Sequence, residues 1–324
     1  MSQAIIEPEG LGYAGPQHWT PPDGVTEHSG RDIAPERDFF APPPAEIGKI
    51  ESAYTTLKST KAPWAAPSRF AFAGTVAAVI AFAIYYFVSN MGGRNSRDLT
   101  VVAIPVGIGA LIGFGIVWWA TRFKHTCSYV GELGLARFVC KGSRDNISKS
   151  DVLLFADAEE LRTSQTRHYT NGVYTGTTYE FTWTDPAGMR RLKLDGSHNG
   201  KNDLPKPDDP FHFAHRGEIQ WSIYRLQKLP DELEKNGYVQ FNLRPGEFVR
   251  VGPGFFEFCL KREVTRITVD EIKVVNLNQG RFSIHSKDVR WFSSQGKFGF
   301  DYAKMANARL FLLAMEKLVG YTFN

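Results

Sequence analysis

The sequence lacks the short motifs that identify common catalytic sites. It holds no Walker phosphate-binding loop, no G-x-S-x-G nucleophile motif and no H-E-x-x-H zinc motif. Cysteine is also scarce, and no C-x-x-C spacing joins Cys127, Cys140 and Cys259. We interpret these three as reduced side chains in a core. We therefore expect no catalytic residue and no cofactor, with an enzyme of unrecognised site as one alternative.

Histidine and aspartate come close together where Asp208 and Asp209 precede His212 and His215. Imidazoles and carboxylates are ligands that a divalent metal ion accepts. The preceding residues are rich in Gly, Asn, Lys, Asp and Pro, however, which is typical of a loop that leads into a helix. We expect surface histidines here and no metal.

Charged side chains and histidine are absent from two long apolar stretches, Phe70 to Ser89 and Leu99 to Ala120. Each covers about 20 residues, or roughly 30 Å of α-helix, which is enough to cross the hydrocarbon core of a bilayer. The stretches are too continuously apolar for the strands of a membrane barrel. We predict a transmembrane helix hairpin over residues 70–120, which makes the chain a multi-pass membrane protein.

Basic residues near the two stretches predict the orientation of the hairpin. Six Lys or Arg lie within about 20 residues outside it, whereas residues 90–98 between the stretches hold only Arg94 and Arg97. Because the more basic side is retained in the cytoplasm, we expect both termini to be cytoplasmic and the protein to lie in the inner cell membrane. The first 20 residues hold no basic start and no apolar core, so a signal peptide is not expected.

Small residues recur at four-residue spacing in both stretches. They are Ala73, Ala77 and Ala81 in the first stretch and Gly109 and Gly113 in the second. Such residues let helix backbones approach closely, so we expect them to pack the two helices together or to pack two copies of the chain into a homo-oligomer. A pore is not expected, because polar side chains are nearly absent from both stretches.

The first 45 residues carry eight prolines and an excess of acids, with little apolar periodicity. A segment of this composition buries too little apolar surface to offset the entropy of ordering, so residues 1–45 are predicted to form a disordered acidic tail. The next apolar residues recur at helical spacing: Ile47, Ile50, Tyr54 and Leu57. Residues 46–69 are therefore predicted to form an amphipathic juxtamembrane segment, as a helix on the bilayer or a linker helix.

Beyond residue 120 the composition changes to short β-like stretches separated by turns, and part of it repeats. The residues Val130-Gly131, Gly134, Phe138, Ile147 and Asp151-Val152 recur as Val251-Gly252, Gly254, Phe258, Ile267 and Glu271-Ile272. This offset of 120 or 121 residues predicts two copies of one unit, over residues 123–235 and 237–324.

Each copy is predicted to hold several short strands and to end in a helix. In the first copy, Asn171-Gly172 is a two-residue turn signal, and apolar and polar residues alternate after it. The apolar residues of the two helical patterns are Ile219, Ile223 and Leu226 in the first copy and Met305, Ala308, Leu312, Met315 and Val319 in the second. Antiparallel strands closed by one helix form the plan of a pleckstrin-homology-like (PH-like) domain.

The chain thereby resembles bacterial membrane proteins of unknown function in which a two-helix transmembrane hairpin is followed by PH-like domains. The resemblance rests on the glycine-led strand starts at Gly134 and Gly254, the Ile-x-x-x-acid-branched steps that end at Val152 and Ile272, Leu229-Pro230 between the copies, and Asn307. It implies a membrane-anchored fold, mainly β with α, with tandem PH-like β-sheet domains each closed by a helix.

The resemblance suggests phosphoinositide binding, which many PH-like domains perform with Lys and Arg at the first strand turn. Here the corresponding turns, residues 131–134 and 252–254, hold no cation. We therefore expect an interaction or scaffold module with a protein partner at the cytoplasmic face of the lipid bilayer, and no nucleic acid. A structural or envelope-stress component that acts by self-association is another alternative. The strand cations Arg190, Arg191 and Lys193 predict a solvated sheet face or, as the sharper option, contact with lipid head groups.

Overall fold

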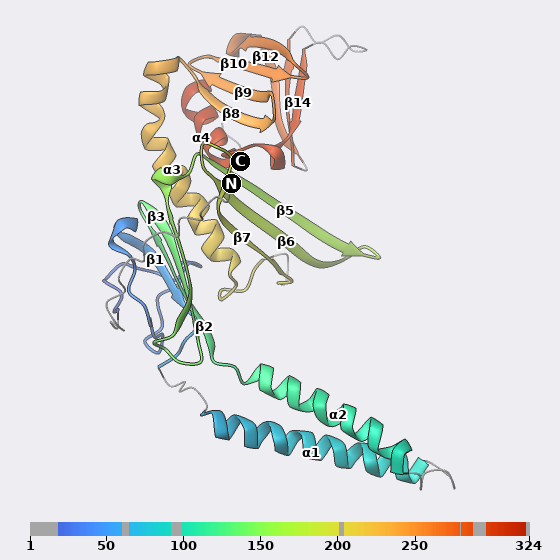
Figure 1. The fold of residues 1–324 in the computed structure, drawn as a ribbon. Coiled ribbons are helices and arrows are strands. Elements are labelled where there is room, and N and C mark those ends of the chain that lie inside the picture. Colours follow the sequence, from blue (N-terminus) through green and yellow to red (C-terminus); the bar gives the residue numbers. More distant parts are fainter. Residues whose placement is uncertain are drawn as a thin grey trace, which may run out of the picture.

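Alternating apolar and polar residues in the C-terminal two thirds of the chain form antiparallel sheets, which assemble into two units of like organisation (Figure 1). The computed structural model describes residues 19–59, 65–91, 99–200, 204–278, 280–287 and 296–321. Within this part, each unit has a four-stranded meander, then a three-stranded meander, then an α-helix. The predicted class, mainly β-structure with helices, is confirmed.

The first unit contains a sheet of order β1-β2-β3-β4, a sheet of order β5-β6-β7, and helix α3. Their bounds are β1 Ile50–Thr55, β2 Lys124–Gly131, β3 Gly134–Lys141, β4 Ile147–Leu154, β5 Glu160–Thr170, β6 Val173–Thr184, β7 Arg190–His198 and α3 Phe211–Asn236.

The second unit contains a sheet of order β8-β9-β10-β11, a sheet of order β12-β13-β14, and helix α4. Their bounds are β8 Val239–Arg244, β9 Glu247–Gly252, β10 Phe255–Leu260, β11 Glu263–Thr268, β12 Ile272–Asn278, β13 Arg281–Ser286, β14 Lys297–Asp301 and α4 Ala308–Val319.

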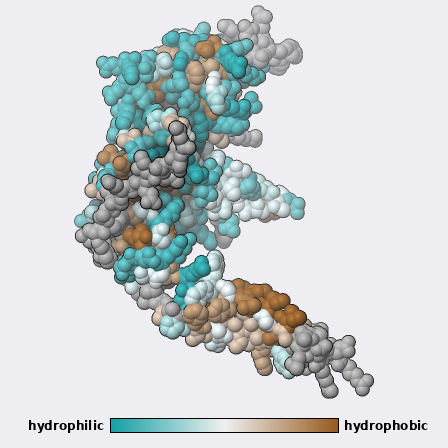
Figure 2. Space-filling view, viewed as in Figure 1, coloured by the Kyte–Doolittle hydropathy of each residue, from teal (hydrophilic) through white to brown (hydrophobic). Residues whose placement is uncertain are grey.

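Two long apolar helices, α1 (Ala66–Met91) and α2 (Leu99–Ala120), form a helix hairpin that extends away from both units (Figure 1). Both are long and apolar enough to cross a membrane. Figure 2 shows hydrophobic surface concentrated on them, because side chains such as Phe82 and Leu111 point outward. At the base of the hairpin Arg69 lies over the Trp118 ring and donates a hydrogen bond to the Trp118 carbonyl, which ties the two helices together.

The hairpin lies inside the first unit's chain path, between β1 and β2. These two strands pair with each other in antiparallel fashion, from Ile50 opposite Gly131 to Thr55 opposite Cys127. The predicted domain boundary at residue 123 and the predicted juxtamembrane helix are therefore wrong. The helical spacing of apolar residues over 46–69 misled because these residues belong to different elements. Ile47 is buried in a 3-10 helix, Ala45–Ile47, and β1 follows it with Ile50 and Tyr54 half-buried.

The predicted disorder of residues 1–45 is wrong for residues 19–45, whereas residues 1–18 lie outside the described residues. Phe39 and Phe40 are buried against the face of the β1–β4 sheet that carries Tyr129 and Phe138. Three acids of this segment are paired: buried Glu27 contacts Arg37 at 3.1 Å, Glu36 contacts Lys58 at 3.3 Å and Asp38 contacts Arg144. The composition misled because the apolar surface that orders this segment comes from strands far along the chain.

The predicted faces of the two closing helices are partly wrong. Ile223 of α3 is exposed, and the helix instead buries Phe213, Ala214 and Trp221 in the first unit. Its later turns direct Leu226 and Leu229 toward the core of the second unit, so one helix serves both (Figure 1). In α4, which begins only at Ala308, Phe311 is fully buried while Leu312 is half-buried.

The sequence repeat is correct at the strand after the glycine turn but loses its register afterwards. Val152 lies within β4, whereas Ile272 begins β12. The structurally equivalent elements of the two units are instead two 3-10 turns, Phe155–Asp157 and Val269–Glu271. Each turn lies just before the three-stranded sheet of its unit. The register shifts because the β3–β4 connection is longer than the Lys261-Arg262 turn of the second unit. The Asn171-Gly172 turn is confirmed, with φ angles of 51° and 79°.

Asn307 holds the two units together. The residue lies just before α4 with a left-handed φ of 56°. Its side-chain oxygen accepts hydrogen bonds from the Leu161 amide at 2.8 Å and the Trp221 indole at 2.9 Å, and its amide donates to the Glu159 carbonyl at 3.1 Å. Arg162 adds hydrogen bonds to carbonyls of the second unit. The units therefore share a buried polar joint.

Candidate functional site

A cleft of about 360 Å³ lies between the two sheets of the first unit. One wall is the inner face of β1–β4, with Tyr54, Lys124, Thr126, Ser128, Arg137, Val139 and Lys149. The other wall comes from β6, β7 and the start of α3, with Tyr179, Leu194, Asp195, Asp208, Asp209, His212 and Phe213. Lys124 begins β2, four residues after the last residue of α2, so the cleft is near the end of the first unit that carries the helix hairpin.

Strand pairing shows why apolar side chains do not fill this cleft. Near the glycine turn of each unit the inward pairs are apolar: Val130 with Leu135, and Val251 with Phe256. The next inward pair is Ser128 with Arg137 in the first unit.

At the same position the second unit has Val249 paired with Phe258, both buried in its apolar core. Polar side chains in the first unit thus occupy an inter-sheet position where the fold otherwise places apolar ones.

The cleft wall on β2–β4 is basic. Arg137 and Lys149 both contact Asp151, at 2.6 Å and 3.0 Å, and Lys124 adds a third cation. Burial works to raise the pKa of Asp151, but hydrogen bonds from Arg137 and Lys149 outweigh it and hold this pKa below its usual range. One carboxylate thus stays ionised beside three cations, and the wall keeps an excess of positive charge.

The opposite wall is acidic. Asp195, Asp208 and Asp209 line it, and among the described residues no ion pair joins any of them to a cation. Burial first, and then Asp209 and Asp195, raise the pKa of the Tyr179 phenol, which therefore stays protonated in the cleft. The two walls carry opposite charges that do not meet each other.

His28 closes the floor of the cleft with a buried imidazole. Its two ring nitrogens lie 2.8 Å from the Ser52 hydroxyl and 3.0 Å from the Ser128 hydroxyl. Burial, together with nearby Arg216 and His212, lowers the pKa of His28 to about 3, so the ring is neutral at physiological pH. Nothing in the sequence pattern indicated this residue, because it falls in the segment predicted to be disordered.

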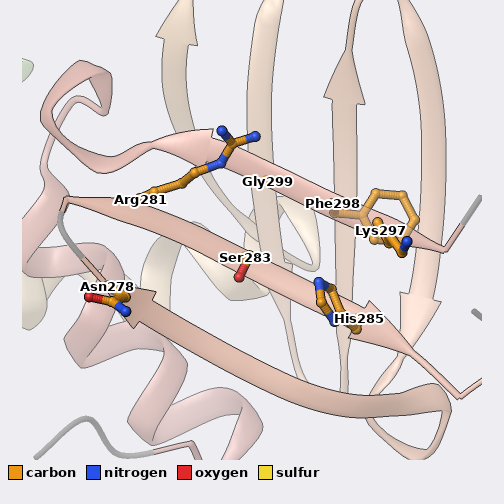
Figure 3. Close-up of a pocket in the computed structure, with 7 residues that line it drawn as sticks. All are labelled: Asn278, Arg281, Ser283, His285, Lys297, Phe298 and Gly299. Carbon is orange, nitrogen blue, oxygen red and sulfur yellow. The ribbon is translucent and has the colours of Figure 1, made fainter. Parts of the chain in front are cut away.

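A second depression lies on the outer face of the β12–β14 sheet, where Arg281, His285 and Lys297 surround Ser283 and Gly299 (Figure 3). Figure 3 shows these side chains along two neighbouring strands, on a sheet face and not between two sheets. The described residues that line this depression include no acid. It is a solvated basic face, and the cleft of the first unit is the more enclosed site.

The β5–β6 hairpin projects from the first unit as an arm, defined here as residues 164–176 (Figure 1). β7 pairs with β6 only from Thr177 onward, so the arm has two strands alone. Tyr169 and Val173 near its tip are 59% and 66% exposed. Beyond the bridge between Arg162 and Ala306, the outer edge of β5 pairs with no strand in the part of the chain that the structure describes.

The small residues of the helix hairpin lie between its own two helices. A Cβ atom on Gly109 would lie 2.1 Å from the Ile84 side chain, and one on Gly113 would lie 2.4 Å from the Ile80 side chain. Ala73 is buried, and Ala77 and Ala81 are half-buried. The close approach thus joins α1 to α2 within one chain.

The three strand cations lie outside the cleft. Lys193 contacts Glu180 at 2.9 Å, and the hydrogen bond from Lys193 to Glu180 raises the Lys193 pKa, while Arg191 lies 3.6 Å from Asp157. Arg190 pairs across the sheet from Thr184, whose other neighbour is Glu160 at the joint between the units. Of the two roles expected for these cations, their positions favour a solvated sheet face over contact with lipid head groups.

The remaining sequence candidates are the three cysteines and the two histidines at the start of α3. Cys127, Cys140 and Cys259 are all buried and free, and burial raises the pKa of Cys127 and Cys140. His212 lines the cleft, whereas His215 stacks on Phe211, and the described residues contain no group of three metal-binding side chains. The cleft itself is visible only in the fold, because its lining comes from segments far apart in the sequence.

No protein-family model matches the chain, and no curated protein matches it.

Proposed function

We propose that the protein is a membrane-anchored interaction module whose two PH-like units hold a protein partner at the cytoplasmic face of the inner membrane. The organisation of each unit supports the PH-like interpretation, because four strands, three strands and a closing helix follow one another in both. The basic residues that flank the helix hairpin support the orientation.

The observation that carries this proposal is the arm. An exposed strand edge presents unpaired backbone groups to which a partner strand can add. Charged residues usually protect such edges, yet residues 164–176 hold Arg167 as their one Lys, Arg, Asp or Glu. Tyr169 and Val173 supply exposed apolar contacts beside this edge.

The position of the helix hairpin in the fold supports an anchor. Along the chain the hairpin lies between β1 and β2, which are paired neighbours in one sheet, and α2 is followed by β2 after three residues. The shared helix α3 and the Asn307 joint hold the second unit to the first. An interaction module gains affinity when its binding surface is held in place beforehand.

Affinity purification of the full chain from detergent-solubilised membranes tests the proposal. We expect a stoichiometric protein partner, and we expect the double variant Tyr169→Ser, Val173→Ser to recover it about tenfold less well. The control is Met189→Ser, Val264→Ser, which removes side chains that are 68% and 61% exposed but lie outside the arm. Equal recovery by both variants would rule out the arm, and recovery of self-copies alone would favour the structural alternative.

Labelling with a membrane-impermeant thiol reagent tests the orientation. Cys127 and Cys259 are buried and make poor reporters, so cysteines are introduced at Ser96, between the two helices, and at exposed Gln227 of α3. We expect labelling at residue 96 and none at residue 227 in intact spheroplasts. The reverse pattern would invert the orientation.

A further inference from the structure

We propose that the cleft of the first unit binds a zwitterionic phosphoethanolamine group, such as the head group of phosphatidylethanolamine in the adjoining bilayer. This inference goes beyond the protein partner proposed for the arm, and it does not depend on that partner.

The first argument is the charge pattern. A ligand that carries an anion at one end and a cation at the other satisfies both walls, because Lys124, Arg137 and Lys149 face one side and Asp208 and Asp209 the other. Among the described residues of the two walls, no ion pair crosses the cleft. A purely anionic ligand would leave the acidic wall without a counter-charge.

The second argument is the chemistry of each end. Lysine and arginine side chains suit a phosphate, which accepts several charge-assisted hydrogen bonds. Carboxylates suit a primary ammonium group, which donates hydrogen bonds that a quaternary ammonium cannot donate. Val139, Leu194 and Phe213 provide apolar contact for the carbon atoms between the two charges.

The third argument is size and place. A cavity of about 360 Å³ is at the small end of the range for ligand pockets, which suits a head group better than a whole large ligand. Thr56 and Lys124 lie at the ends of β1 and β2 that lead into the helix hairpin, so the cleft is next to the surface of the bilayer that the hairpin enters.

Native mass spectrometry of the detergent-solubilised full chain tests this inference. The protein is offered equal amounts of phosphatidylethanolamine, phosphatidylcholine and phosphatidylglycerol. We expect preferential retention of phosphatidylethanolamine, and about tenfold weaker retention by Asp208→Asn or Lys124→Gln, because each loses one charge-assisted hydrogen bond.

Asp231→Asn and Arg190→Gln make the same charge changes at exposed positions outside the cleft and are expected to retain the lipid. Equal retention of the three lipids, or equal losses in cleft and control variants, would overturn the inference.

A soluble probe, glycerophosphoethanolamine, distinguishes the two sources of the head group. Displacement of the lipid by this probe would show that the head group is recognised in either source, with the lipid binding more tightly. Binding of the probe without retention of the lipid would assign a free phosphoethanolamine compound as the ligand, and binding of neither would overturn the inference. A thermal unfolding midpoint close to that of the unchanged protein shows that each cleft variant folds. Retention of the lipid and recovery of the arm's protein partner are separate measurements, so the two proposals fail separately.

Discussion

The two units place different side chains at the same point of the same strand pair. Ser128 pairs with Arg137 in the first unit, and Val249 pairs with Phe258 in the second. The second unit therefore has one continuous core, whereas the sheets of the first unit enclose a charged cleft. One architecture thus holds a packed core in one copy and a charged cleft in the other, while both copies keep the same strand pairing after the glycine turn.

The units differ in a second way, at the connection between their first two strands. Pro245-Gly246 joins β8 to β9 in a tight turn, with Gly246 at a φ of 78°. Residues 56–123, including both apolar helices, join β1 to β2. Because neighbouring antiparallel strands tolerate either a short turn or a long excursion, the two apolar helices enter the fold without changing the sheet.

Exchanging Phe258 and Arg137, which occupy the same position in the two units, has the largest expected effect on the free energy of unfolding. Phe258→Arg places an unpaired cation in the core and removes a buried ring, which should cost about 4 kcal/mol or more and unfold the second unit. Arg137→Phe, the reverse exchange, should leave the first unit folded, because the side chain lines an open cleft. Denaturant unfolding and limited proteolysis measure both, and similar losses from the two exchanges would contradict the comparison.

Uncoupling of the units comes next. Asn307→Ala removes three side-chain hydrogen bonds and places alanine at a φ of 56°, so it should cost about 2 to 4 kcal/mol. Because α3 and Asn307 join the units, we expect one thermal transition for the unchanged protein and two for the variant. Asn307→Gly loses the same hydrogen bonds but tolerates the backbone angle, and a smaller loss with glycine separates strain from hydrogen bonding. A single unshifted transition in both variants would show that α3 and the Arg162 hydrogen bonds couple the units without Asn307.

Acid should destabilise the first unit before the second. The pKa of His28 is about 3 in the folded state, against 6.5 for an unperturbed histidine, so the unfolded chain binds more protons between these values. The contribution of His28 is complete above pH 6.5 and falls by about 1.4 kcal/mol for each pH unit below it.

The second unit has no buried histidine among its described residues. Fluorescence-detected unfolding at about pH 7 and about pH 5.5, on either side of the ordinary histidine pKa, should therefore show a smaller pH effect in His28→Gln than in the unchanged protein. The same pH effect in both proteins would exclude His28 as the cause.

Substitutions in the helix hairpin should give the smallest effect. Gly109→Leu and Gly113→Leu direct a side chain into Ile84 and Ile80, which can partly shift, so we expect a loss of about 1 kcal/mol in helix association. Gly107→Leu and Gly115→Leu are matched controls, because no atom lies within 4 Å of a Cβ at either position. Disulfide crosslinking between cysteines placed on α1 and α2 measures the difference. An equal response of all four variants would show that the small residues do not set the approach of the helices.

Residue patterns along the chain correctly predicted the elements that depend on neighbouring residues. Uninterrupted apolar stretches predicted α1 and α2, and Asn171-Gly172 predicted the turn of the arm, because backbone geometry and local composition determine both. The strand after each glycine turn was also correct, whereas the lengths of the later connections were not, and the repeat lost its register there.

Contacts between distant segments were decided by the tertiary structure alone. The segment of residues 19–45 is acidic and rich in proline, yet it is ordered because a sheet built largely from residues 124–154 offers it an apolar face. The cleft likewise joins His28 to Ser128, a residue on a strand far along the chain. The sequence singled out Asn307 only as part of a resemblance, and the approach of the two units gives it three partners. The sequence by itself determined where the chain is helical, extended or turned, because those choices are local. The fold decided which polar side chains are buried and paired, because burial depends on surfaces that come together only when the chain has folded.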